Sequence, residues 1–214
     1  MVEYIWDKEM CRRYTDGLRP FVKFDHRRIA KIISKRVEKK PNQKVVDIAS
    51  GPGFLQLELS KYLYNPVLVA QDMHGNMLEI AKEEAVRYGK QIETCECPAE
   101  ELTIDTGSVD VVVCKQLLHE VKMPEKVLKE ICRILKPGGK AFIIDFDADG
   151  SKLVARLLQA MLLITRGKFM AESFWKSFSA GLKGEAIAAQ LQSLHMKEVE
   201  YIKMGANYFT SGRK

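Results

Sequence analysis

A glycine-containing loop and two carboxylates give this sequence its clearest chemical signal. The loop, Asp-Ile-Ala-Ser-Gly-Pro-Gly, runs from Asp47 to Gly53, and a second acidic residue, Asp72, follows it. Glycines allow a tight turn and let a ligand approach the main chain. In open α/β sheets, an acidic residue about 20 positions after such a loop accepts hydrogen bonds from ribose hydroxyls. Together these features predict a site for a nucleoside ligand.

The details of the loop narrow the choice of nucleoside. A dinucleotide site carries a third glycine three positions after the second one, where this chain has Gln56. A phosphate-binding P-loop ends in Gly-Lys-Ser/Thr, and this loop has no such ending. The loop is therefore typical of a site for an adenosine ligand without phosphates, and S-adenosylmethionine fits that description.

A histidine near the expected substrate position is the candidate catalytic group. His119 follows a predicted strand by a few residues, where an imidazole can act as a general base. The alternative is a histidine that begins a helix and takes no part in chemistry. No metal site is predicted, because Cys95 and Cys97 lack further cysteine or histidine ligands nearby. An odd total of five cysteines favours reduced thiols.

Short apolar runs alternate with longer amphipathic runs from residue 44 onward. Strands are predicted over residues 45–49, 67–70, 92–95, 109–114 and 141–146, with helices over 54–63, 76–88 and 125–135. Lys-Pro-Gly-Gly at 136–139 is expected to separate the third helix from the fifth strand. Strands separated by such helices form parallel βαβ units. A helix over 185–194 and strands over 197–203 and 207–210 complete a doubly wound, mostly parallel, seven-stranded α/β sheet with helices on both faces and an antiparallel last strand.

Two helical segments accompany this sheet pattern. Residues 1–43 are expected to form an N-terminal helical lid, with a short helix around 5–13 closed by Asp16 and Gly17 and an amphipathic helix around 29–37. They hold twelve Lys/Arg and six Asp/Glu, which is the whole net charge of +6 of the 214-residue chain. Residues 151–184 are rich in Leu, Met, Phe and Trp and predict a helical cap after the fifth strand. This cap belongs to a predicted cofactor-binding domain over residues 44–214.

Four ordered motifs resemble one enzyme family. They are the loop 47–53, the segment 70–78 around Asp72, Ala-Glu-Glu-Leu at 99–102, and Glu-Ile-Cys-Arg-Ile-Leu-Lys-Pro-Gly-Gly at 130–139. In this order and spacing they resemble the class I S-adenosylmethionine-dependent methyltransferases, in particular the branch containing the ubiquinone/menaquinone C-methyltransferases. The resemblance covers about residues 4–147 well. It implies an enzyme that uses S-adenosyl-L-methionine and releases S-adenosyl-L-homocysteine.

The resemblance also implies which residues contact the cofactor. Asp72 would take both ribose hydroxyls, and Met73 would pack on adenine. Asp47 either organises the loop through backbone hydrogen bonds or contacts the cofactor directly. The chain departs from the family in having Cys97-Pro98 where an Asp usually precedes the Ala-Glu pair, which puts a side-chain contact to the adenine amine in doubt. The other implied contacts are Ala49, Ser50, Gly51 and Gly53 on the methionine half, Ala99 and Glu100 at the adenine edge, Lys115 and Gln116 near the methyl group, and Tyr14 as a cover.

The apolar cap predicts a small apolar or aromatic molecule as the methyl acceptor, because ligand pockets are mostly hydrophobic with few polar anchors. A sulfonium is an excellent leaving group, so positioning of the acceptor supplies much of the rate enhancement. Three alternatives concern the cap residues: they pack on the sheet, they pack against a second subunit in a homodimer, or residues 153–164 contact a membrane surface.

Two other functions stay open from the sequence. An RNA or protein methyltransferase would dock its substrate on the basic N-terminal helix, through Arg27, Arg28 and Lys31. Nucleic acid is the less favoured partner, because no Asn/Asp-Pro-Pro-aromatic motif follows the fourth strand. The other function is a cofactor-binding accessory protein without turnover. The apolar run 153–164 is shorter than the roughly 20 residues of a membrane span, and the N-terminus lacks a signal-peptide pattern, so a cytoplasmic protein without a transmembrane segment is expected.

Overall fold

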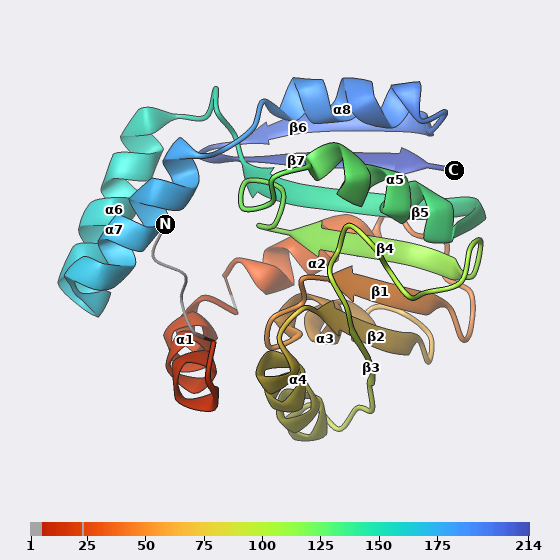
Figure 1. Cartoon of the computed structure of the whole chain (residues 1–214), viewed down its shortest axis with the longest axis horizontal. Helices are drawn as coiled ribbons and strands as arrows, with labels where there is room; N and C mark the ends of the chain where they lie inside the picture. Colours follow the sequence, from red (N-terminus) through yellow and green to blue (C-terminus); the bar gives the residue numbers. More distant parts are fainter. Residues whose placement is uncertain (1–5, 23) are drawn as a thin grey trace.

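The computed structural model describes residues 6–22 and 24–214, which form one seven-stranded sheet with helices on both faces (Figure 1). The strands are β1 (Lys44–Ile48), β2 (Val67–Asp72), β3 (Glu93–Glu96), β4 (Val109–Lys115), β5 (Leu135–Phe146), β6 (Lys197–Met204) and β7 (Asn207–Arg213). The helices are α1 (Lys8–Val22), α2 (His26–Ser34), α3 (Phe54–Ser60), α4 (Gly75–Arg87), α5 (Pro124–Ile134), α6 (Lys152–Arg166), α7 (Lys168–Ser179) and α8 (Gly184–Ser193). The order β3-β2-β1-β4-β5-β7-β6, with β7 antiparallel to β5 and β6, confirms the predicted fold class.

The central strands are buried on both faces of the sheet. β1 pairs in parallel with β2 on one side and with β4 on the other. One apolar cluster lies under α2 and α3, and another lies under α5 and α8 on the opposite face. Continuous runs such as Val45-Val46 are typical of parallel strands that are covered on both faces. The strand order reverses between β1 and β4, and ligands bind at such a switch point in open α/β sheets.

Strand β5 begins earlier than the sequence predicts. The segment 136–139, expected to precede the strand, lies inside it. Gly138 has a left-handed φ of 82°, and the pairing of β5 with β4 shifts register in this region. Two backbone hydrogen bonds hold the segment, because Gly138 N donates to Lys214 O at 2.7 Å and Lys214 N donates to Gly139 O at 2.9 Å. The glycines therefore form an irregularity within the strand.

Helix α1 is longer than the sequence predicts. A helix ending at Asp16 and Gly17 is expected, but α1 continues through both residues and through Pro20 to Val22. The expected start at residue 5 lies outside the described residues. Glycine and proline disfavour a helix interior by about 1 and 3 kcal/mol relative to alanine. Contacts with the rest of the molecule must therefore stabilise the last turns of α1.

Those contacts come from α4, which follows some seventy positions later in the chain. Lys8 Nζ is 2.9 Å from Glu79 Oε2, and Arg19 Nη2 is 2.6 Å from the buried Glu84 Oε1. Arg12 and Glu83 form a longer ion pair of 3.6 Å between them. The apolar side of the contact consists of Cys11, Met77 and Ile80, with Trp6 and Tyr14 packed against them.

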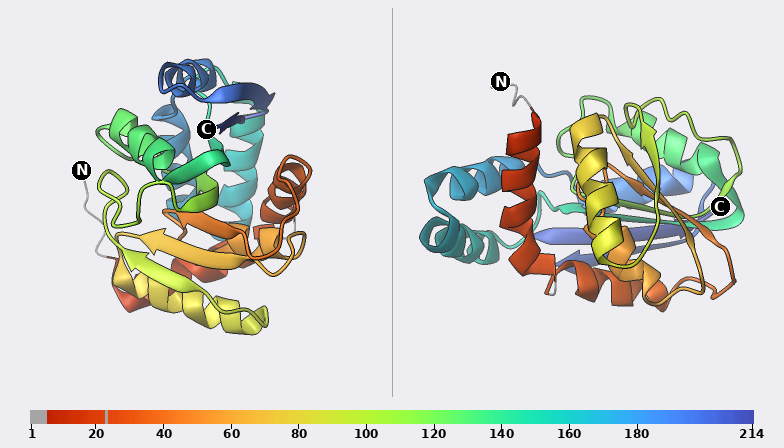
Figure 2. Two further views of the ribbon diagram at one scale, coloured as in Figure 1. Left: turned by 90° about the vertical axis from the view of Figure 1, so that its right-hand side faces the viewer. Right: turned by 90° about the horizontal axis from the view of Figure 1, so that it is seen from below.

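Helices α6 and α7 lie side by side beyond the carboxyl ends of the central strands, next to α1 (Figures 1 and 2). They occupy the place where the sequence predicts a helical insertion. Asp147 N donates to Ala206 O and Ala148 N donates to Leu182 O, both at 3.0 Å, at the base of this hairpin. Within the described residues, no helix is both long enough and apolar enough to cross a membrane.

Candidate functional site

The glycine loop and Asp72 are joined by hydrogen bonds at the carboxyl ends of β1 and β2. Gly51 N donates to Asp72 Oδ2 and His74 N donates to Asp72 Oδ1, each at 3.0 Å. Gly51 and Gly53 have left-handed φ angles of 52° and 73°, which glycine adopts readily. Burial raises the pKa of Asp72, although the amides of His74 and Gly51 lower it. The structure thus brings together the loop and the carboxylate that the sequence predicts as a nucleoside site.

Gln71 links the glycine loop to the segment after β3, and this role was not predicted from the sequence. Its side-chain Oε1 accepts a hydrogen bond from Ala49 N at 3.0 Å, and its Nε2 donates to Cys97 O at 2.5 Å. Its backbone oxygen accepts from Ser50 N at 2.8 Å. Ala49 has a positive φ of 50°, and the bond to Gln71 helps to hold that conformation. The available signal was a polar residue at the end of the apolar run 67–70.

Asp47 is a buried carboxylate beneath the loop. It is 2% exposed, and its Oδ2 has no hydrogen-bond partner. Burial raises the pKa of Asp47 to about 7, although the amide of Gln56 and the charge of Lys115 lower it. An unpartnered buried carboxylate oxygen is costly unless a ligand supplies a donor. Asp47 is therefore placed to bind a positively charged or hydrogen-bond-donating group.

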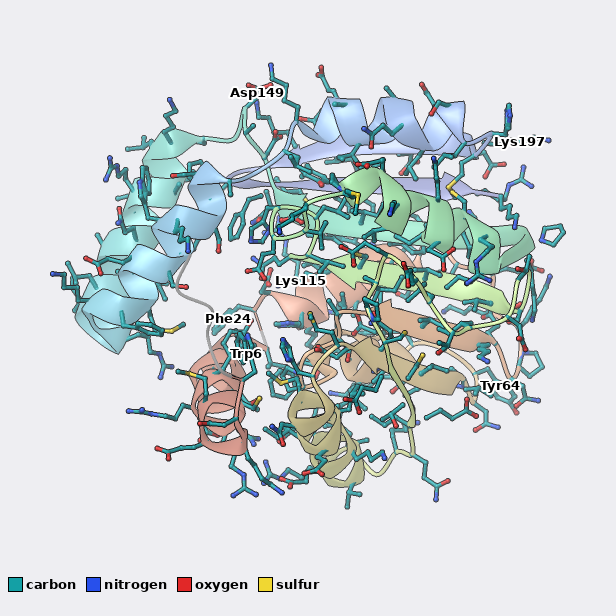
Figure 3. All side chains as sticks on the ribbon, in the orientation of Figure 1. Trp6, Phe24, Tyr64, Lys115, Asp149 and Lys197 are labelled. Atoms are coloured by element: carbon teal, nitrogen blue, oxygen red, sulfur yellow. The ribbon has the colours of Figure 1, made fainter. Side chains whose placement is uncertain are left out.

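A pocket opens between the glycine loop, α1 and the end of β4. Lys115 Nζ lies 3.0 Å from Asp25 Oδ2, which joins β4 to the start of α2. Tyr14 packs edge to face on Trp6, with ring centroids 5.3 Å apart. Figure 3 labels Trp6 on the α1 side and Lys115 on the sheet side. The predicted site residues that line this pocket are Tyr14, Asp47, Ala49, Ser50, Gly51, Lys115 and Gln116.

The other predicted cofactor contacts lie outside the lining of this pocket. Gly53 N donates to Ser50 O at 2.9 Å and so closes the loop. Met73 is 63% exposed, whereas the side chain of Ala99 lies in the apolar core and Glu100 is half-buried. The roles implied for these residues toward adenine stay predictions.

His119 forms a buried pair with Asp145, which lies near the end of β5 and was not predicted. His119 Nδ1 is 2.6 Å from Asp145 Oδ1. Burial by itself lowers the pKa of His119, but hydrogen bonds to Asp145 and Glu120 outweigh it and raise the pKa to about 9. His119 Nε2 forms an ion pair of 3.5 Å with Glu120 Oε1 and has no other partner among the described residues. The residue lies in a turn and does not begin a helix, and its catalytic role stays a prediction.

Aromatic rings connect this pair to the cap helices. The rings of His119 and Phe146 meet edge to face with centroids 5.1 Å apart. Phe146 in turn meets Phe174 and Phe178 of α7 edge to face, at 5.5 and 6.3 Å. Trp175 lies 5.5 Å from Phe178 by ring centroids. One side of the His119 ring therefore meets an aromatic cluster that continues into α7.

Comparison with known proteins gives likenesses to methyltransferases. Residues 46–143 match the family described as "Methyltransferase domain". Over this stretch, which is just under half of its length, the chain is similar to methyltransferases. A ubiquinone biosynthesis O-methyltransferase of Escherichia coli is 26% identical over 163 residues, which cover 74% of this chain and 66% of the relative. A ubiquinone/menaquinone biosynthesis C-methyltransferase of Geotalea daltonii is 30% identical over 52% of this chain and 49% of its own length.

Solved structures agree with the fold of this chain. A putative S-adenosylmethionine-dependent methyltransferase from Methanococcus maripaludis has a TM-score of 0.76 at 20% identity, and the match covers 100% of this chain and 96% of that one. A methyltransferase from Aquifex aeolicus has a TM-score of 0.70 at 19% identity, covering 97% and 98% of the two chains. The aligned part of this chain spans just under two thirds of the E. coli relative.

The residues around the pocket fit S-adenosylmethionine. The unpartnered Oδ2 of Asp47 suits the ammonium of a methionine moiety, since both its charge and its free acceptor are buried beside the loop. Asp72 offers a carboxylate at the strand end where this fold class places ribose. Within residues 6–22 and 24–214, no group of three or more His, Cys, Asp or Glu is placed to hold a metal ion.

Proposed function

We propose that this protein transfers a methyl group from S-adenosylmethionine to a small apolar or aromatic molecule. The observation that carries the choice of acceptor is the placement of the His119–Asp145 pair against Phe146, whose ring continues into the aromatic residues of α7. An imidazole next to an aromatic cluster suits a flat apolar molecule that carries one ionisable hydroxyl. The quinone-pathway names of the relatives support an acceptor of this kind.

The chain's own residues divide the work of binding. Asp47 and the loop at 49–53 would hold the methionine half of the cofactor, and Asp72 would hold the ribose. Tyr14 would cover this half from α1 and exclude water, since it packs on Trp6 above the pocket. When bound, S-adenosylmethionine supplies an electrophilic methyl group on a good leaving group. Residues 1–43 act in this proposal as a lid, and 151–184 as a cap over the acceptor.

His119 would take the proton of the acceptor hydroxyl. Its Nδ1 is held by Asp145, so the proton that the acceptor loses would go to Nε2, which otherwise faces only the exposed Glu120 at 3.5 Å. Asp145 keeps the ring oriented and stabilises the imidazolium that results. A pKa of about 9 makes His119 a strong base, but only in its neutral form, which is the minor form at neutral pH.

Binding of S-adenosylmethionine to the purified protein tests the first part of the proposal. We expect calorimetry to show binding by the unaltered chain and a loss of at least about tenfold in Asp72→Ala, because a buried carboxylate that accepts charged or polar donors is removed. Asp149→Ala is the matched control, since Asp149 is an exposed carboxylate distant from the pocket (Figure 3). Turnover would then be measured with labelled cofactor on a panel of apolar phenols. If the folded protein does not bind S-adenosylmethionine, the proposal is wrong.

An RNA or protein acceptor is the second candidate. Arg28 and Lys31 on α2 are exposed, which leaves a basic surface outside the pocket. Charge reversal at Arg27, Arg28 and Lys31 would separate the two functions: the small-molecule function predicts unchanged turnover, and the RNA function predicts loss of salt-sensitive RNA binding and of activity. An accessory protein without turnover would bind cofactor and label no acceptor.

A further inference from the structure

Helix α6 has an outer face that is apolar and covered by nothing in the described structure. Leu153, Leu157 and Ile164 are 71, 63 and 84% exposed. Their spacing of four and seven residues places them on one side of the helix. Met161 and Val154 extend this side, each somewhat over a third exposed. Large apolar side chains gathered on one surface mark a contact with another molecule or with a membrane.

The packing of α6 on the protein does not account for these residues. The inner face of the helix, with Ala155 and Leu162 buried, packs toward Phe146 and Phe178. Ser151 begins the helix by accepting a hydrogen bond from Val154 N at 3.3 Å. The helix is therefore formed and held by its inner face, and the outer face adds apolar surface that the fold itself does not use.

The charges on α6 are of one sign. Lys152, Arg156 and Arg166 lie on it, and the helix contains no Asp or Glu. Arg156 is stacked over the Trp175 ring, with 3.7 Å from Cζ to the centroid. By helical spacing, Lys152 and Arg156 lie on one flank of the apolar stripe, whereas Arg166, in the last turn, lies on the opposite side of the helix. An apolar stripe next to a basic flank is the pattern of helices that lie in the plane of a membrane surface.

We propose that α6 docks this protein on an anionic lipid surface, with Leu153, Leu157 and Ile164 among the acyl chains and the basic flank at the phosphates. Charge complementarity selects this occupant over a second copy of the chain. A two-fold dimer would place α6 against α6, and so bring basic residues together with no carboxylate on either helix. The helix hairpin is also the outermost part of the molecule on the side of the pocket (Figures 1 and 2).

The position of α6 gives the docking a consequence for the site. The same hairpin presents α6 outward and, through Phe174 and Phe178 of α7, contacts Phe146 beside His119. An apolar acceptor dissolved in the bilayer would then enter between the cap helices and the carboxyl edge of the sheet. This consequence rests on the proposed function, whereas the docking itself does not.

Flotation with lipid vesicles tests the docking in the absence of cofactor and acceptor, so its outcome is independent of methyl transfer. The probes are phosphatidylcholine vesicles with and without phosphatidylglycerol. We expect the full chain to float with the anionic vesicles and Leu157→Glu/Ile164→Glu to lose about a hundredfold in partitioning, because two large apolar side chains no longer enter the acyl region. Val86→Glu is the matched control, since Val86 is 75% exposed on α4, away from the hairpin.

A lysine variant and the oligomeric state complete the test. Lys152→Gln should weaken binding to anionic vesicles and leave the weaker binding to neutral ones unchanged. Circular dichroism of each variant checks that it is folded. The docking is overturned if the unaltered chain fails to float, or if Leu157→Glu/Ile164→Glu floats as well as the control. It is equally overturned if sedimentation shows a dimer that Leu157→Glu/Ile164→Glu dissociates, because a second copy would then cover this face.

Discussion

Two carboxylates only one strand apart have different environments in this site. Asp72 has both oxygens occupied by backbone amides, from Gly51 and His74. Asp47 is more deeply buried and keeps one oxygen without a partner, and burial raises its pKa to about 7. A carboxylate in this condition is held ready for a cationic ligand group at a cost to the stability of the unliganded protein.

Asp47 should make cofactor binding depend on pH. Its folded pKa of about 7 lies above the value of roughly 3.9 in an unfolded chain. Affinity for S-adenosylmethionine should therefore fall by roughly tenfold per pH unit below 7, as the carboxylate becomes protonated. Calorimetry at about pH 5.5 and pH 7 measures this, and Asp47→Asn should bind weakly with no such dependence. Equal affinities of the unaltered protein at the two pH values would contradict the assignment.

The raised pKa of Asp47 acts on folding in the opposite direction: rising pH strengthens cofactor binding but lowers the stability of the unliganded protein. Between about pH 4 and pH 7 the folded protein holds a proton on Asp47 that the unfolded chain has lost, so the stability of the unliganded protein from this group decreases as pH rises through that window. Asp47→Asn should remove this decrease and be more stable than the unaltered protein in urea at pH 8. A variant that is less stable at pH 8 would show that Asp47 serves mainly to organise the loop.

His119 and Asp145 should set the pH profile of turnover. If neutral His119 is the base, kcat/KM should rise with pH and level off above about 9. His119→Gln should abolish the rise. Asp145→Asn should move the inflection to lower pH, because it removes a hydrogen bond that raises the pKa of His119. An NMR titration of the His119 imidazole checks the same shift without an acceptor, and an unchanged inflection in Asp145→Asn would reduce Asp145 to a packing role.

At the scale of elements, ion pairs with α4 stabilise the last turns of α1, where Gly17 and Pro20 disfavour a helix. Glu84, whose side chain is 2% exposed, receives two bonds from Arg19, at 3.0 and 2.6 Å, and one of 2.6 Å from Arg87. Hydrogen bonds of this kind are worth about 1.5–3 kcal/mol when charged groups are involved. This contact holds the part of α1 that follows Gly17.

Glu84→Gln should therefore lower the free energy of unfolding by about 1–3 kcal/mol, because it leaves Arg19 without its buried counter-charge. Urea unfolding measures the loss, and limited proteolysis should cut α1 faster. Asp16→Asn serves as the control: Asp16 also pairs with Arg19, but its side chain is 71% exposed, so the change should be below about 1 kcal/mol. Equal losses in both variants would mean that the buried pair does not hold α1.

The elements predicted well are those whose signal is local. The buried runs at 45–48 and 67–70 and the glycines after them are read directly from adjacent residues, and the structure has strands and a turn there. The predicted end of α1 was wrong because Glu84, which stabilises the last turns of the helix, is 65 residues from Arg19 in the sequence. Asp145 was missed for the same reason, since it meets His119 only once β5 has paired beside β4. The spacing of residues along the chain is enough to predict a loop. A pair of side chains from distant segments can be predicted only when the order of the strands in the sheet is known.

At the scale of the whole molecule, the basic excess of residues 1–43 has a partly internal use. Lys8, Arg12 and Arg19 face the acidic residues of α4. Lys115 and Asp25 similarly join the sheet to the segment before α2. These pairs place α1 over one side of the pocket, and the aromatic contacts of Phe146 place α7 near the other. The site is thus bounded by two helical covers: α1 is held by ion pairs together with a small apolar cluster, and α7 is held by aromatic packing.

The two tryptophans of the chain can report on these covers separately. Trp6 packs on Tyr14 and His74 beside the cofactor pocket, and Trp175 lies in the cap, on Phe178. In Trp175→Phe, S-adenosylmethionine should change the fluorescence of Trp6, because the ligand enters next to Tyr14. In Trp6→Phe, the emission of Trp175 should respond little to cofactor and shift to shorter wavelength with an apolar phenol or with anionic vesicles. A cofactor response confined to Trp175 would place the cofactor under the cap and contradict the assignment of α1 as its cover.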